Sequence, residues 1–155
     1  MGKLEIKMVQ EGPILKVKLN GEIDEDIDFS QSNINSSSQI SFDLEGVKSI
    51  NSCGIREWIK WLSTAKSAQI VFLKCPKIIV DQINMVDSFL PSNAQVDSFY
   101  VPYFNEDSGE EKSILFTRNV EFSKENLKTP VVKDSKGNDM EMDILESKYF
   151  KFLKK

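Results

Sequence analysis

The chain has 155 residues, a length that suits one domain or one domain with a small appendage. Apolar residues make up 40 % of it, which is enough for a core, and the net charge of −4 with a pI of about 5.0 disfavours a nucleic-acid partner. The absence of histidine excludes a Ser-His-Asp or Cys-His catalytic arrangement within this chain. We therefore expect no cofactor and no enzymatic activity.

The sequence also carries no sign of a membrane or secretory protein. No apolar run approaches the roughly 18 residues of a membrane span. Residues 1–7 alternate polar and apolar side chains, unlike a signal peptide. Two cysteines without a disulfide framework suit a reducing compartment. We expect a cytoplasmic protein with no membrane partner.

The N-terminal part predicts a hairpin followed by polar loops. Alternating apolar residues predict strands at 3–9 and 14–20, joined by a turn at residues 12–13. An acidic stretch follows, and it is either a solvated loop or an acidic rim, at Asp24 and Asp26, that helps to choose a partner. The serine-rich residues 30–38 predict a flexible loop.

A strand, a polar loop and a helix are predicted in succession between residues 40 and 66. Apolar residues alternate from residue 40 to residue 44, and Gly46 is expected to end this strand. Asn51 and Ser52 are both good N-cap residues for a helix that begins at Cys53 or Gly54. The apolar stripe of this helix comprises Ile55, Trp58, Ile59 and Leu62.

The next segments predict a parallel sheet. The apolar run 69–74 is typical of a buried parallel strand. A strand–helix–strand order predicts a right-handed crossover that makes 40–45 and 69–74 parallel neighbours. Pro76 starts a second helix whose apolar face continues to Leu90, and residues 94–104 predict the last strand. The fold class is therefore α/β, with a mixed sheet of about five strands, helices packed on one side, and a C-terminal hairpin and helix extension.

The extension, residues 101–155, contains a predicted strand at 113–117, two extended pieces about a turn within 131–142, and a helix at 143–153. The turns Asn105-x-x-Ser108-Gly109 and Lys133-x-x-Lys136-Gly137 resemble the Cys-x-x-Cys-Gly knuckles of a zinc ribbon. Asparagine, serine and lysine cannot form a tetrahedral zinc site, so we expect no metal. The extension is either a zinc ribbon that has lost its zinc or two ordinary hairpins.

Two motifs resemble those of STAS domains, the fold of anti-sigma-factor antagonists. One is Phe42-Asp-Leu-Glu-Gly-Val47 followed by Ile50-Asn-Ser-Cys-Gly-Ile55, and the other is Leu19-Asn-Gly-Glu-Ile-Asp24. The resemblance covers roughly residues 3 to 100, and it implies a STAS-like domain at 1–100 followed by the extension at 101–155.

The resemblance implies a non-enzymatic bacterial protein of signal transduction. Its partner would be a regulatory protein, such as an anti-sigma-type kinase, docked through a loop and the following helix. The docking residues would be Asn51, Ser52, Cys53, Gly54 and Glu57.

The phosphorylated serine of the family motif corresponds to Cys53, and the aspartate to Asn51. Because a thiol is not a substrate for the same kinase chemistry, we expect docking without phosphorylation at this position. Ser52 is then either a remaining phosphoacceptor or, as we favour, a helix N-cap.

Three alternatives stay open. The helix N-terminus could act as an anion site of a small-ligand or nucleotide sensor, although no Gly-rich loop or well-placed basic residue supports it. The extension could assemble several copies of this chain as a homo-oligomer. Cys53 and Cys75 are expected at the same sheet edge, either as buried apolar residues or as a reversible disulfide.

Overall fold

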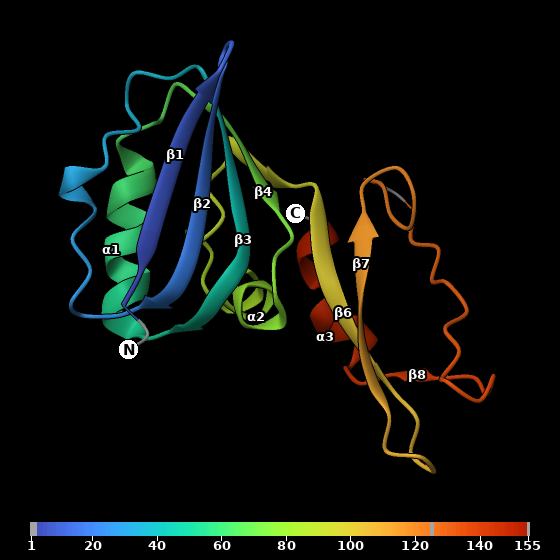
Figure 1. Cartoon of the computed structure of the whole chain (residues 1–155). Helices are drawn as coiled ribbons and strands as arrows, with labels where there is room; N and C mark the ends of the chain where they lie inside the picture. Colours follow the sequence, from blue (N-terminus) through green and yellow to red (C-terminus); the bar gives the residue numbers. More distant parts are fainter. Residues whose placement is uncertain (1–2, 125, 155) are drawn as a thin grey trace.

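The computed structural model describes residues 3–124 and 126–154, which form a five-stranded and a three-stranded sheet (Figure 1). The larger sheet has the order β1-β2-β3-β4-β5, in which β1 is antiparallel to β2 and the other neighbours are parallel. Its strands are β1 Glu5–Glu11, β2 Ile14–Ile23, β3 Gln39–Ile50, β4 Gln69–Leu73 and β5 Ala94–Val96. The predicted α/β class, the hairpin and the five-stranded mixed sheet are confirmed.

The two long helices, α1 (Ser52–Ser63) and α2 (Lys77–Met85), connect parallel strands of this sheet. Because the strands are added in one direction from β2 to β5, right-handed crossovers place both helices on the same face. On that face the ring of Phe42 lies 5.2 Å from Trp58 and 5.4 Å from Trp61. The opposite face of β3 presents the polar side chains of Ser41 and Asp43, so the sheet is covered on one side, as predicted.

The prediction that Gly46 ends β3 is wrong, because the strand continues to Ile50. A Cβ atom on Gly46 would lie 1.8 Å from the side-chain oxygen of Asn20 on β2. The ladder between β2 and β3 shifts register after Lys18 and again after Gly21. The glycine therefore marks an irregularity where two strands approach closely, not a strand end.

The serine-rich loop is held against α1 more firmly than its composition predicts. It contains a short 3₁₀ turn, Phe29–Gln31, and the ring of Phe29 stacks on Trp61 at a centroid distance of 4.2 Å. The indole N–H of Trp61 donates to the carbonyl of Ser32 at 2.7 Å. Ile34 is fully buried, so this loop contributes to the core.

Helix α2 begins after Pro76, as predicted, but ends at Met85, five residues before Leu90. Val86 is extended, and the chain then turns so that Phe89 becomes fully buried. The carbonyl of Phe89 accepts a hydrogen bond from Trp58 at 3.3 Å, and the two rings stack. These contacts with α1 replace the last predicted helical turn.

The extension forms the smaller sheet, in the antiparallel order β7-β6-β8. The predicted strand 94–104 is divided at Asp97 between the two sheets. The closing helix is shorter than the predicted helix at 143–153, and Leu145, which that range includes, is 66 % exposed. The elements are β6 Ser98–Phe104, β7 Glu111–Thr117, β8 Glu141–Met142, α3 Glu146–Tyr149 and the 3₁₀ turn η2 Lys151–Lys154.

The side chain of Asn84 on α2 joins the end of the extension to the first part of the chain. Its amide donates to the carbonyl of Tyr149 and its oxygen accepts from the backbone N–H of Phe152, both at 2.9 Å. Buried side chains from both sheets form one continuous core. The division at residues 100 and 101 stays a prediction.

Among the helices in the described ranges, none combines the length and the apolar character that crossing a membrane requires.

Candidate docking site at the start of helix α1

Asn51 fastens the first turn of α1 to the neighbouring strand and loop. Its side-chain oxygen accepts from the backbone N–H of Gly54 at 2.9 Å, which is the predicted N-cap. Its side-chain amide donates to Glu25 Oε2 at 2.7 Å, and its backbone N–H donates to the carbonyl of Ile23 at 3.2 Å. The helix begins at Ser52, one residue before the predicted start, so the favoured prediction that Ser52 is the N-cap is wrong.

Gly54 is required by the approach of this turn to β2. A Cβ atom at position 54 would lie 2.1 Å from the carbonyl oxygen of Ile23, which is a backbone atom and cannot rotate away. The glycine of the motif is therefore buried under the helix start and cannot itself touch a partner. Its role is to let α1 begin directly on the end of β2.

The other predicted docking residues do come together at the solvent. Asn51 and Ser52 are exposed, while Cys53 and Glu57 are half-buried. Glu57 lies 3.5 Å from Lys60 in a solvated ion pair. Arg56 is also exposed on this turn, and the sequence analysis did not include it, although it follows Cys53 by three residues and so shares its face.

The acidic loop lies beside this helix start. Asp24 accepts a hydrogen bond from the backbone of Asp26 at 3.0 Å. A hydrogen bond within Glu25 itself and the one from Asn51 lower the pKa of Glu25. The sequence places Glu25 in the acidic stretch, but only the folded chain brings it to Asn51. A hollow of about 790 Å³ opens between this loop and the first residues of β1.

The carboxylate of Glu25 argues against the alternative in which the N-terminus of α1 is an anion site. The N-cap hydrogen bond already uses one amide of the first turn of α1. Glu25 adds a negative charge directly at the cap residue. A second anion placed there would be repelled, so the charge distribution gives no support to a phosphate or nucleotide site at this helix N-terminus.

Both cysteines are free thiols in different environments. Cys75 is fully buried, pairs with Phe99 in a short bridge between the two sheets, and has its thiol pKa raised by burial. Cys53 is half-buried at the start of α1. Cys75 is thus a core residue, as the simpler of the two alternatives expects.

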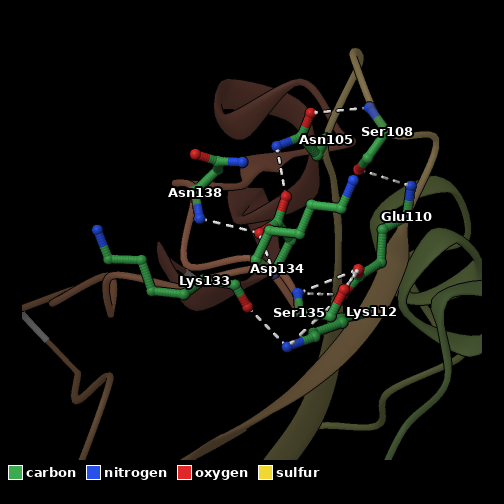
Figure 2. A network of polar contacts seen from close by, with 9 residues as sticks. Asn105, Ser108, Glu110, Lys112, Lys133, Asp134, Ser135 and Asn138 are labelled. Carbon is green, nitrogen blue, oxygen red and sulfur yellow. Dashed lines mark hydrogen bonds and ion pairs between the residues drawn. The ribbon is translucent and has the colours of Figure 1, made fainter.

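The two knuckle-like turns of the extension lie side by side (Figure 2). The amide of Asn105 donates to Asp134 Oδ2 at 2.9 Å, while its oxygen accepts from the backbone of Asp107 and Ser108. Asp134 Oδ1 accepts from the backbone of Lys136 in the second turn, also at 2.9 Å. The residue that corresponds to Asn105 is therefore Asp134, one position after the predicted Lys133.

Lys133 makes its side-chain contact within its own hairpin and not with the first turn. Lys133 forms an ion pair with Asp139, and its carbonyl accepts from Lys112 at 2.6 Å. Lys136 is exposed. Glu110 accepts from the hydroxyl of Ser135 at 2.7 Å, which ties the turns together a second time (Figure 2). Within residues 3–124 and 126–154, no cluster of His, Cys, Asp or Glu could hold a metal ion.

No protein-family model matches this chain, and no curated protein matches it. A comparison with solved structures finds an anti-sigma factor antagonist from Mycobacterium paratuberculosis, with a TM-score of 0.44 and 13 % sequence identity. The match covers 56 % of this chain and 80 % of that chain. At this identity and TM-score, the likeness carries no conclusion about the family or the function of this chain.

Proposed function

We propose that this chain is a non-enzymatic interaction module of the STAS type, which docks a regulatory protein through residues 51–54 and helix α1. The observation that carries the proposal is the accessibility of the first turn of α1. Ser52 is exposed and Cys53 half-buried, with the motif glycine beneath them. The extension packs on α2 and lies on the side of the molecule away from α1 (Figure 1).

The charges around this turn indicate the chemistry of the partner. Asp24, Glu25 and Asp26 flank the helix start, and Glu57 lies one turn further along α1. A partner surface with arginine or lysine side chains would complement this rim, and such complementarity mainly raises the association rate and the specificity. An anti-sigma-type kinase is the natural candidate from the resemblance of the motifs.

Because Cys53 occupies the phosphoacceptor position of the motif, we propose that phosphorylation at this position does not control docking. A phosphate would add a charge of about −2 beside the carboxylate of Glu25, which would oppose contact with a protein surface. A serine kinase does not phosphorylate the thiol of Cys53, so this charge is not added. Docking is then constitutive or regulated in another way.

A binding measurement with a purified anti-sigma-type kinase from the same organism tests the docking surface. We expect isothermal titration calorimetry to give one kinase site per chain, and Glu57→Arg to weaken binding at least tenfold. Glu141→Arg is the matched control, because Glu141 is an exposed acid on β8, far from α1. Equal affinity of wild type and Glu57→Arg would exclude α1 as the docking surface.

A phosphorylation assay with the same kinase tests the role of position 53. We expect no phosphate on the wild-type protein after incubation with ATP, and phosphate at position 53 in Cys53→Ser. Ser52→Ala in the Cys53→Ser background should still accept phosphate. Phosphate mapped to Ser52 of the wild type by mass spectrometry would contradict the proposal.

We further infer that the extension is a zinc-ribbon-like unit that folds without metal. The hydrogen bond between Asn105 and Asp134 joins the two turns at the place where a ribbon would use a metal ion. The purified protein should therefore contain no stoichiometric zinc, and a chelator should leave its melting temperature unchanged. One bound zinc per chain would overturn this inference.

A further inference from the structure

Strand β1 forms an open edge of the larger sheet. Glu11 and Ile14 close a two-residue turn, so the odd-numbered residues of β1 bond to β2. The backbone groups of Ile6, Met8 and Gln10 therefore point outward, where the described residues supply no further strand. A strand of seven residues with unpaired backbone groups is a template for pairing with another strand.

The opposite edge of the sheet is closed by contrast. Strand β5 has only three residues. The guanidinium of Arg118 donates to the carbonyl of Val96 at 2.7 Å and to the carboxylate of Asp97 at 2.9 Å. Of the two edge strands of this sheet, β1 is therefore the one open to pairing with another strand.

The side chains of β1 on the uncovered face form a distinctive series. Val9 is 57 % exposed between Lys7 and Glu11. Lys7 lies directly opposite Lys18 of β2, which brings two positive charges together on neighbouring strands and is unfavourable. In the described part of the chain, no carboxylate lies within ion-pair distance of Lys7.

We propose that β1 pairs antiparallel with β1 of a second copy of this chain, with Val9 opposite Val9, so that one sheet runs through a two-fold dimer. In this register Met8 and Gln10 form the hydrogen-bonded pairs that their outward backbone groups require. Lys7 then faces Glu11 of the second copy, and two-fold symmetry repeats this ion pair on the other side. The carboxylate of Glu11 from the second copy also offsets the repulsion between Lys7 and Lys18.

Charge favours this register over those centred on Met8 and on Ile6. Centring the pair on Met8 would place Glu5 opposite Glu11, a contact between two carboxylates. Centring it on Ile6 would pair Glu5 with Lys7 but would set the exposed Val9 opposite Lys3. On the uncovered face, the register centred on Val9 places Val9 opposite Val9 and Lys7 opposite Glu11.

Space at the edge is compatible with this arrangement. The hollow beside the acidic loop is lined on its β1 side by Leu4 and Ile6, which leaves room for the hairpin turn of the second copy. The contact is centred on Val9, whereas the docking loop lies beyond the other end of β1. Residues 51–54 would therefore stay accessible in each copy, while the hairpin turn of the second copy would lie beside Asp24 and Asp26 of the acidic loop. The dimer does not depend on the proposed docking function.

Sedimentation equilibrium of the full chain over a range of concentrations tests the dimer. We expect the mass to rise from 17.7 kDa toward twice that value, with micromolar dissociation because an edge contact is small. Val9→Asp should shift the curve to the monomer, since it opposes two carboxylates at the two-fold axis. Its side chain is mostly exposed, so circular dichroism should show an intact fold.

A charge exchange identifies the register. Lys7→Glu and Glu11→Lys should each weaken the dimer at least tenfold, and the double variant should restore it. Glu11 also pairs with Lys16 in its own chain, and that pair is lost equally in the single and the double variant, so restoration isolates the contact between copies. Lys66→Glu, an exposed charge reversal after α1, is the matched control.

Two results would overturn the proposal. A mass of 17.7 kDa at every concentration would mean that Lys7 protects the edge from pairing, which is a common role of lysine on edge strands. A dimer that is unaffected by Val9→Asp or by the charge exchange would lie on another surface.

Discussion

The side chain of Asn51 donates to Glu25 Oε2 at 2.7 Å while it caps α1 through Gly54. The STAS motif that this segment resembles has aspartate at the corresponding position. An aspartate at 51 would place two carboxylates in contact, so asparagine suits a chain that carries glutamate at position 25. The departure from the motif at 51 is thus explained by a residue 26 positions away.

Asn51→Ala should lower the free energy of unfolding by about 1 kcal/mol, because it removes the N-cap together with the link to Glu25. Urea denaturation followed by circular dichroism measures this loss. Asn35→Ala is the control, since Asn35 is exposed and its side chain makes no hydrogen bond in the described structure. Equal losses in the two variants would mean that the cap contributes nothing.

Gly54→Ala should destabilise the fold far more than Gly12→Ala. The added methyl group of the first variant meets the carbonyl of Ile23 at 2.1 Å, so α1 must move off the end of β2. Gly12 has open space around it but a φ of +58°, and alanine there should cost about 1 to 2 kcal/mol. Thermal unfolding of both variants checks the order, and a more stable Gly54→Ala variant would refute the close approach.

The two thiols should react in sequence with a thiol reagent such as 5,5′-dithiobis(2-nitrobenzoic acid). Cys53 is half-buried and should react in the native protein, while the fully buried Cys75 should react only after denaturant is added. Cys53→Ser should abolish the native reaction and leave the denatured one. Reaction of two thiols per native chain would show that the bridge between Cys75 and Phe99 opens readily.

The turns of the extension should make stability depend on acid pH. Hydrogen bonds from Ser135 lower the pKa of Glu110, and hydrogen bonds from the backbone of Asn138 and Lys136 lower the pKa of Asp134. Carboxyls with a lowered pKa in the folded state stabilise it above their unfolded pKa of about 4, and lose this contribution as the pH falls further.

The melting temperature should therefore fall as the pH is lowered from about 5 to about 3. Asp134→Asn should be less stable at neutral pH, because an amide would face the amide of Asn105, and its decline in acid should be shallower. Asp107→Asn, at an exposed position of the neighbouring turn, should leave the slope unchanged. An unchanged slope in Asp134→Asn would mean that another carboxyl causes the acid loss.

Local patterns in the sequence predicted the larger sheet because each element carries its own signal. The alternation of Ile40, Phe42 and Leu44 and the cap at Asn51 depend only on neighbouring residues. Their parallel arrangement followed from the order of elements. The docking residues also lie within one short segment, so the sequence alone could group them.

Contacts between distant residues account for the predictions that were wrong. The helical spacing of Val86 and Leu90 favoured a longer α2, but the stacking of Phe89 on Trp58 decides where the helix ends. Gly46 resembled a strand end because Asn20, the close neighbour that requires glycine at this position, lies on another strand. The correspondence between Asn105 and Asp134 could not be found by spacing. The first turn closes from Asn105 to Glu110 and the second from Asp134 to Asn138, which is one residue shorter.

The hydrogen bonds of Asn84 affect how the protein unfolds. It holds the backbone of Tyr149 and of Phe152 with one side chain, so the last turns of the chain cannot leave α2 without exposing its buried face. The melting of the two sheets should then be coupled, and calorimetry should record one cooperative heat-absorption peak rather than two.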